Sequence, residues 1–234
     1  GLTTYRLHFP AEVTAVAVAG VLRVAAAESR GGFLSPKAPI VVETVLRRRE
    51  VFWWISVDDR RARHLQAAAE RELPGMRWEE AARPRLALTR AVELRVNSQE
   101  RLLDADLAEA TVHRLLGVAG GLRKNEVVLV QWQIGAWLPR SPIPPAAAPE
   151  PRTIWNLPEW GNPVRDSEQV TALRKKQAEH IFAAVGRVAV GAAADQRADG
   201  LLASTINAYQ LLRAPGVGVS RRRLPSWWVR CRLE

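Results

Sequence analysis

Hydrophobic positions along the amino-terminal part of the chain change from a helical to a strand-like spacing. Residues 14–29 are rich in Ala and Val with few helix breakers, which predicts a helix capped by Thr14. Residues 40–46 and 51–57 are rich in β-branched and aromatic side chains. A polar Arg-Arg-Arg-Glu turn separates them, so together they predict a β-hairpin.

A second helix is expected directly after this hairpin. Asp58 and Asp59 are suited to cap its first turn, and apolar side chains over residues 60–73 recur at helical spacing. The pair Pro74-Gly75 is typical of a helix end. We expect a short strand to follow at residues 76–80.

Further strands and helices alternate as far as residue 137. Residues 85–96 alternate between apolar and polar side chains, and residues 126–137 form a strongly apolar run, so both predict strands. Between them, residues 103–118 have helical spacing. The apolar residues of that helix are Leu107, Val112, Leu115 and Leu116. Recurrence of strand, helix and strand predicts layered α/β packing rather than a helical bundle or a β-sandwich.

The pattern Asp-x-Arg-Ala-x-x-Leu occurs twice, each time after a predicted strand (51–57 and 185–190) and at the start of a helix that ends at Pro-Gly. Its residues are Asp59, Arg61, Ala62 and Leu65 in one copy and Asp195, Arg197, Ala198 and Leu201 in the other. In such a motif Asp caps the helix, Ala permits close packing, Leu enters the core and Arg is solvated. Binding of a phosphate or of a partner carboxylate is the less favoured alternative. The predicted fold is α/β (α+β), with duplicated ferredoxin-like βαβ halves and mixed or antiparallel sheets packed by helices.

Five prolines fall within the eleven residues 141–151, which excludes both helix and sheet interior there. This segment is therefore expected to be a linker. It divides the sequence into an amino-terminal α/β domain, residues 1–140, and a smaller carboxy-terminal α/β domain, residues 152–234.

The formal net charge of +10 favours acidic partners such as nucleic acid or an anionic membrane surface. A generally arginine-rich composition explains the charge equally well. The best candidate for a nucleic-acid or partner-binding surface is Arg221, Arg222 and Arg223 beside Trp227 and Trp228, because arginine contacts phosphates and tryptophan stacks on bases. A contact between domains is the alternative explanation.

Catalytic chemistry is not evident from the sequence. No segment matches the Gly-x-x-x-x-Gly-Lys-Ser/Thr loop that holds nucleotide phosphates, the single cysteine excludes a thiolate metal cage, and the four histidines are scattered. The acidic pairs, Glu79-Glu80 among them, are each explained as a helix cap or a solvated strand edge. We therefore expect no catalytic residue, no metal and no cofactor, although an enzyme whose active-site residues converge from distant positions stays a third alternative.

Four segments carry a resemblance to a known family: Val51-Phe-Trp-Trp-Ile-Ser-Val-Asp-Asp-Arg-Arg-Ala through Leu73-Pro-Gly-Met, Arg174-Lys-Lys-Gln-Ala-Glu-His-Ile-Phe, Arg187-Val-Ala-Val and Asp195-Gln-Arg-Ala. Together they resemble the region that precedes the motor domain in conjugation and type IV secretion ATPases of the HerA/FtsK superfamily. The resemblance extends over about residues 21–228 and rests on order and spacing more than on an invariant motif.

The resemblance implies a non-catalytic assembly or docking domain of a DNA- or protein-translocating ATPase. Such a domain lies at the cytoplasmic face of the cell membrane, helps to form a hexamer and contacts other subunits of the transfer complex, while a motor after Glu234 would bind ATP. No membrane span is expected in this sequence, since its longest apolar stretch is interrupted by charged residues and glycine. A nucleic-acid-binding module with a basic, Trp-flanked surface is the second hypothesis.

Overall fold

The computed structural model describes residues 2–28, 40–97, 103–137, 171 and 182–225, and these form a mixed α/β structure with one antiparallel sheet. The first elements are β1 (Thr3–His8), α1 (Ala15–Glu28), β2 (Ile40–Arg47), β3 (Glu50–Val57), α2 (Asp59–Glu72) and β4 (Arg77–Glu80). The others are β5 (Arg90–Val96), η1 (Ala105–Leu107), α3 (Ala108–Gly120), β6 (Val127–Trp137), β7 (Phe182–Gly191), α5 (Asp195–Tyr209), η2 (Gln210–Leu212) and β8 (Val219–Arg223).

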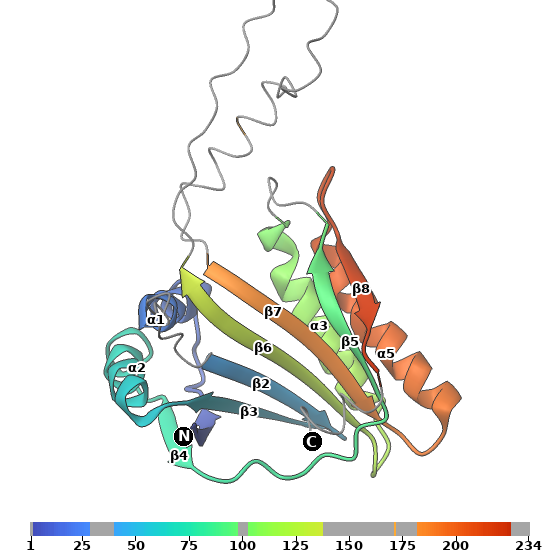
Figure 1. Cartoon of the computed structure of the whole chain (residues 1–234), viewed down its shortest axis with the longest axis horizontal. Helices are drawn as coiled ribbons and strands as arrows, with labels where there is room; N and C mark the ends of the chain where they lie inside the picture. Colours follow the sequence, from blue (N-terminus) through green and yellow to red (C-terminus); the bar gives the residue numbers. More distant parts are fainter. Residues whose placement is uncertain (1, 29–39, 98–102, 138–170, 172–181, 226–234) are drawn as a thin grey trace, which may run out of the picture.

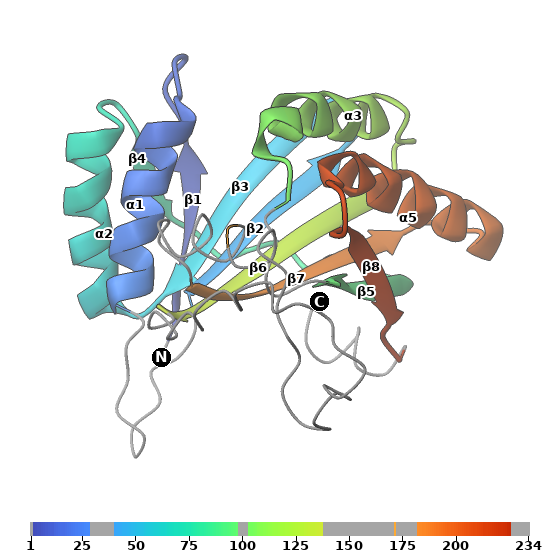
Figure 2. The same cartoon turned by 90° about the horizontal axis from the view of Figure 1, so that it is seen from above.

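Eight strands lie side by side in the order β4-β1-β3-β2-β6-β7-β5-β8, and each neighbouring pair is antiparallel (Figure 1). Helices α1, α2, α3 and α5 all lie on one face of this sheet (Figure 2). The predicted α/β class is therefore confirmed, with one continuous sheet in place of separate ones.

The described elements divide into two sets with the same order. Elements β1-α1-β2-β3-α2-β4 form one set and β5-α3-β6-β7-α5-β8 the other. From the middle of the sheet outward, the strands follow as β2-β3-β1-β4 on one side and as β6-β7-β5-β8 on the other. Each set has the β-α-β-β-α-β order expected of a ferredoxin-like unit. That the two are duplicated ferredoxin-like halves stays a prediction.

This arrangement differs from a division into residues 1–140 and 152–234. Strands β6 and β7, which come before and after the proposed linker in the sequence, pair with each other from Val127–Gly191 to Trp137–Phe182. Strand β5, which comes before it, pairs with both β7 and β8. Described parts of both sequence regions thus belong to one sheet. Residues 141–151 lie outside the described residues.

Apolar side chains between the helices and the sheet form two clusters, one for each pair of helices. Ala62 and Leu65 of α2 pack with Ile55 of β3 in the first cluster. Ala198 and Leu201 of α5 pack with sheet residues in the second. Burial of the Ala and Leu of both motif copies confirms their predicted structural role.

The opposite face of the sheet is partly covered by the segment 81–89, which connects β4 to β5. Leu86 and Leu88 of this segment pack against Val45, Leu129 and other side chains of that face. The sequence pattern predicts a strand from residue 85, but β5 begins at Arg90. The apolar side chains alternate here because the chain crosses the face of the sheet and buries Leu86 and Leu88, with an exposed residue between them. The predicted alternation of buried and exposed side chains was therefore correct, but the predicted start of the strand was wrong.

Helix α3 has the predicted position but a different buried side. The buried residues of this helix are Thr111 and Ala119, whereas Val112 is 52% exposed and Leu116 is exposed as well. Leu107, which directly precedes the helix, is also exposed. Helical spacing of these apolar residues predicted the helix correctly, although it did not indicate the side that faces the core.

Candidate functional site

Strand β8 is the outermost strand at one edge of the sheet, and Arg221, Arg222 and Arg223 are exposed there. Side chains alternate along a strand. Arg221, opposite the core residue Leu94, therefore lies on the helix side, as does Arg223, while Arg222 lies opposite Glu93 on the other face. The predicted basic triplet is split between two faces instead of forming a single patch.

A hollow of about 380 Å³ lies between β8 and α5, and its lining includes Arg90, Asp199, Arg221 and Arg223. Nη2 of Arg90 lies 2.7 Å from Oδ2 of Asp195, and its Nε lies 3.6 Å from Oδ1 of Asp199. Two carboxylates thus offset the charge of Arg90. Arg221 and Arg223 are the two further cations that line this hollow.

Tryptophans of the proposed binding surface, Trp227 and Trp228, lie outside the described residues. The other adjacent pair behaves as the alternation of a strand predicts. Trp54 is buried on the face without helices, whereas Trp53 lies on the helix side and makes an edge-to-face contact with Phe9 at 5.5 Å between ring centroids. Trp53 and Trp54 therefore have packing roles in the sheet.

At the opposite edge of the sheet, β4 has the sequence Arg-Trp-Glu-Glu. Arg77, Glu79 and Glu80 are exposed, while Trp78 packs edge-to-face on Tyr5 with ring centroids 5.7 Å apart. This edge has two carboxylates and one guanidinium, and the β8 edge has three guanidinium groups. The two edges of the sheet therefore differ in the sign of their charge.

A row of directly opposed residues crosses all eight strands on the face without helices. Its members are Glu79 (β4), Arg6 (β1), Trp54 (β3), Glu43 (β2), Gln131 (β6), Arg187 (β7), Glu93 (β5) and Arg222 (β8). Opposite charges directly across a strand pair stabilise a sheet. Such neighbours occur at Glu79–Arg6, at Arg187–Glu93 and at Glu93–Arg222.

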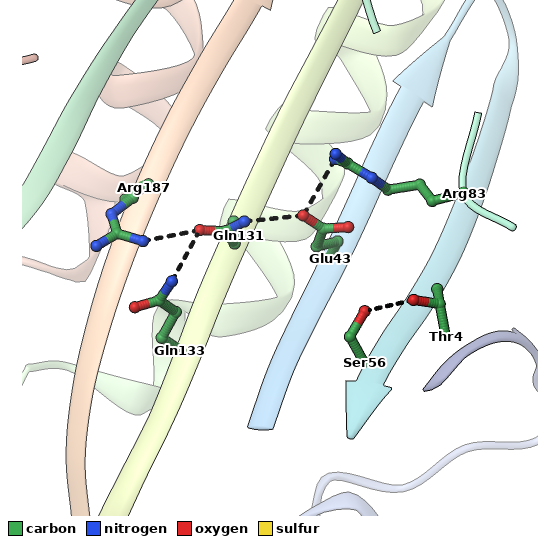
Figure 3. A network of polar contacts seen from close by, with 7 residues as sticks. All are labelled: Thr4, Glu43, Ser56, Arg83, Gln131, Gln133 and Arg187. Atoms are coloured by element: carbon green, nitrogen blue, oxygen red, sulfur yellow. Dashed lines mark hydrogen bonds and ion pairs between the residues drawn. The ribbon is translucent and has the colours of Figure 1, made fainter. Parts of the chain in front are cut away.

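The middle of this row is a hydrogen-bonded network (Figure 3). Gln131 donates from Nε2 to Oε1 of Glu43 at 2.8 Å, and Arg187 donates from Nη1 to Oε1 of Gln131 at 3.0 Å. Arg83, from the connecting segment 81–89, donates from Nη1 to the same Glu43 oxygen at 3.2 Å. Glu43 and Gln131 are only 4% and 5% exposed. Burial lowers the pKa of Arg187, and the charge of nearby Glu93 opposes this effect.

The first copy of the repeated motif differs from its predicted capping role. Asp58, not Asp59, caps α2 by accepting a hydrogen bond from the backbone N–H of Arg61 at 3.1 Å. Burial acts to raise the pKa of Asp58, but hydrogen bonds from the Arg61 backbone and guanidinium outweigh it and lower the pKa. The Arg61 side chain is 2% exposed and donates to Asp58, so the prediction of a solvated Arg was wrong.

In the second copy, Asp195 is the first residue of α5 and pairs with Arg90. The N-cap residue is Ala194, and no side chain caps the helix. Arg197 binds the buried carboxylate of Glu126, just before β6, with two hydrogen bonds of 2.9 Å. These bonds lower the pKa of Glu126 below its ordinary value. Both motif arginines therefore bind carboxylates within the chain, which explains them as structural residues.

Two signals for the arrangement of the edges were present in the sequence. Glu43 and Gln131 interrupt otherwise apolar strands, which marks polar positions on a buried face, and Glu79-Glu80 places acidic side chains on a short strand. Sequence reasoning missed that Glu79, Glu43 and Gln131 share one row with Arg222. Strand order determines that relation, and strand order is not local information.

The most distinctive features of the described residues are the two outer strands, β4 and β8, with their exposed charged side chains. Among them, no cluster of three or more His, Cys, Asp or Glu residues could hold a metal ion. None of the described helices is both long and apolar enough to cross a bilayer. An edge strand can bind a further strand through its outward N–H and C=O groups.

No protein-family model matches the chain, and comparisons with curated proteins and with solved structures give no match.

Proposed function

We propose that this chain is a non-catalytic assembly or docking domain of a DNA- or protein-translocating ATPase of the type IV secretion and conjugation kind. The resemblance described above supports the class of machine. The main support in the structure is the pair of outer strands β4 and β8, which have exposed side chains of opposite charge. In this proposal the domain acts at the inner face of the cell membrane and contacts other subunits of the transfer complex.

Within the described part of the chain, each of the six inner strands pairs with two neighbours, whereas β4 and β8 pair with only one. The outward backbone groups of an edge strand form a template for another strand. Proteins commonly protect such edges with charges of one sign, which repel other copies. Here Glu79 and Glu80 lie at the β4 edge and three arginines lie at the β8 edge. These charges favour pairing of β4 with β8 between copies, whereas charges of one sign at both edges would disfavour every such pairing.

Sedimentation velocity of the purified chain tests the assembly role. We expect self-association that increases with protein concentration and weakens at high salt, because salt screens interactions between exposed charges. Hydrolysis of Mg-ATP by the same sample is expected to equal that of buffer. A chain that stays monomeric at every concentration and salt, or that hydrolyses ATP, would contradict the proposal.

Nucleic-acid binding is a second candidate function, and the observation that favours it is the exposed arginine triplet of β8 beside the hollow. Arg221 and Arg223 follow each other on one side of the strand, about 7 Å apart along it, so both can contact one phosphate backbone. A titration of fluorescent single-stranded DNA tests this function. Binding that weakens with salt and is lost when Arg221, Arg222 and Arg223 are replaced by alanine supports it, while binding that is unchanged by the replacement excludes these residues.

A further inference from the structure

We infer that copies of this chain associate head to tail by pairing β4 of one copy with β8 of the next in a defined antiparallel register. This inference rests on the proposed assembly function and names the partner, which is a second copy of the chain. Three independent features support it: the directions of the edge strands, the faces on which their side chains lie, and their charges.

Strand direction is the first feature. The eight strands are joined by seven pairings, each of them antiparallel, so β4 and β8 at the two ends run in opposite directions. If a second copy is placed beside the first with its helices on the same side, its β4 is antiparallel to β8 of the first copy. The joint therefore continues the hydrogen-bonding pattern of the sheet and leaves the helices of both copies on one face.

The face of the sheet on which each side chain lies limits the possible registers between β4 and β8. Directly opposed residues of two paired strands lie on the same face of a sheet. Glu79 lies on the face without helices, as does Arg222, whereas Glu80, opposite Tyr5, lies on the helix side with Arg221. A register that places Glu79 opposite Arg222 also places Glu80 opposite Arg221, so both carboxylates meet a guanidinium on the correct face.

The same register places Trp78 opposite Arg223, where a guanidinium can contact an aromatic ring. Neighbouring registers that preserve the faces are shifted by two residues. One shift places Arg77 opposite Arg222, which brings like charges together, and the other places Glu79 opposite the apolar Leu224. Only the unshifted register gives all three arginines of β8 a favourable partner.

In this register the polar row of one copy continues into the next. Arg222 ends the row at β8, and Glu79 begins it at β4. Across the joint, the charges would follow as Glu93, Arg222, Glu79 and Arg6, which alternate in sign. A repeated head-to-tail contact of this kind forms a closed ring if the rotation between copies closes, and a filament if it does not.

Symmetric pairing of like edges is less favourable at β8 than at β4. Joining two β8 strands brings two arginine triplets together. Joining two β4 strands with Trp78 opposite itself places Arg77 opposite Glu79, and these opposite charges attract each other. The test must therefore distinguish a β4–β8 joint from a β4–β4 joint.

Cysteine cross-linking distinguishes these joints. The chain has one cysteine, Cys231, which is replaced by serine in every variant. Directly opposed residues of antiparallel strands have Cα atoms about 4.5–5.5 Å apart, within the range for a disulfide. We expect the variant with both Glu79→Cys and Arg222→Cys to form a ladder of disulfide-linked species under mild oxidation.

The matched control contains Arg77→Cys and Arg222→Cys, which are two residues out of register and about 7–8 Å apart. It is expected to form no ladder. Dimers from a variant with Arg77→Cys and Glu79→Cys, which lie opposite each other in the β4–β4 joint, would indicate β4–β4 pairing and overturn the inference, as would dimers from Arg222→Cys alone for β8–β8 pairing. Equal ladders from the test and control pairs would overturn the register.

Charge reversal provides a second test without cross-linking. One variant contains Glu79→Arg with Glu80→Arg, and the other contains Arg221→Glu with Arg222→Glu. Each alone is expected to associate about tenfold or more weakly than the parent chain, because like charges oppose each other at the joint. A mixture of the two is expected to associate again, since each edge then meets its complement. Circular dichroism checks that both variants are folded.

The outcomes separate the inference from the function on which it rests. Association that is unaffected by both charge reversals overturns the β4–β8 joint and leaves the assembly function in place. Absence of any association in the parent chain contradicts both.

Discussion

Arg197 of α5 binds Glu126 through two nitrogens of its guanidinium group: Nε donates to Oε1 and Nη2 donates to Oε2, each at 2.9 Å. The same Nη2 donates to the carbonyl oxygen of Gly121 at 2.8 Å, and Glu126 accepts a further hydrogen bond from the backbone N–H of Arg123. One arginine thus joins α5 to the turn between α3 and β6. A two-point contact of this kind requires the planar fork of arginine.

Removal of this contact is expected to destabilise the chain. Arg197→Met leaves the buried Glu126 carboxylate without its main partner, which should lower the free energy of unfolding by about 2–3 kcal/mol. Urea denaturation followed by circular dichroism measures the change. Arg114→Met on the exposed surface of α3 is the control, with an expected change within about 0.5 kcal/mol. Equal effects of the two substitutions would show that the contact contributes little.

Acid should weaken the fold through Glu126 and Asp58. The folded-state pKa of each lies below its ordinary value, 4.5 for Glu126 and 3.8 for Asp58, so the folded state binds these protons less readily than the unfolded state. The stabilisation that these two carboxylates give the folded state is therefore present above their ordinary pKa values. It is lost as the pH falls through their lowered folded-state pKa values.

We expect the urea midpoint to fall as the pH is lowered from about 5 towards 3. Glu126→Gln should reduce this dependence, because it removes one of the two groups. A Glu126→Gln variant with the parent's full acid dependence would exclude Glu126 as a source. Substitution of Glu109, an exposed carboxylate on α3, by glutamine is the control.

Local patterns predicted most elements of the fold, although no strand was predicted at β1 (Thr3–His8). Thr14 caps α1 as expected, with its Oγ1 accepting from the backbone N–H of Ala17 at 3.2 Å, and the hairpin of β2 and β3 lies where β-branched residues flank a polar turn. Both Pro-Gly pairs also mark turns, since Gly75 and Gly216 have positive φ angles of 88° and 74°. Each of these features depends on residues close together in the sequence.

Features that depend on distant residues were not predicted. Leu86 and Leu88 alternate like residues of a strand, but only the position of the sheet shows that they cross its face. Arg197 appeared solvated because its partner Glu126 is 71 residues away in the sequence. The relation of Glu79 to Arg222 depends on the order of all eight strands, so it could not be recognised from either residue.

Two glycines should respond in opposite ways to substitution by alanine. A Cβ atom at Gly191 would lie 2.0 Å from the carbonyl oxygen of Ala87, in the segment that crosses the sheet, so backbone must move. We expect a loss of at least about 2 kcal/mol of stability. A Cβ atom at Gly200, inside α5, would meet nothing within 4 Å, and alanine should stabilise the helix there by about 0.4–1 kcal/mol.

Thermal and urea unfolding of both glycine variants measure these changes. Gly191→Ala as stable as the parent would show that segment 81–89 can move away from β7 at little cost. The stabilising Gly200→Ala variant serves as the control for the general effect of adding a methyl group.

Alkaline pH should weaken the packing of Tyr209, which lies between α5 and the sheet. Burial raises its pKa to about 12, with a hydrogen bond involving Trp132 acting in the opposite direction. The folded state therefore retains the phenol proton at a pH where the unfolded state, with the ordinary value of 10.0, releases it. Stability from this group is complete below about pH 10 and decreases as the pH rises towards 12.

The chain has two tyrosines, and the pKa of Tyr5 is raised as well, by burial and by the charges of Asp59 and Glu80. Ultraviolet absorbance of tyrosinate should therefore show both groups ionising above pH 10.0, with Tyr209 ionising together with unfolding. Tyr209→Phe is expected to remove that component and to leave the Tyr5 titration unchanged. If Tyr209 instead ionises near its ordinary pKa in the folded chain, solvent reaches its hydroxyl, and the edge-to-face contact with Trp132 at 6.3 Å does not enclose it.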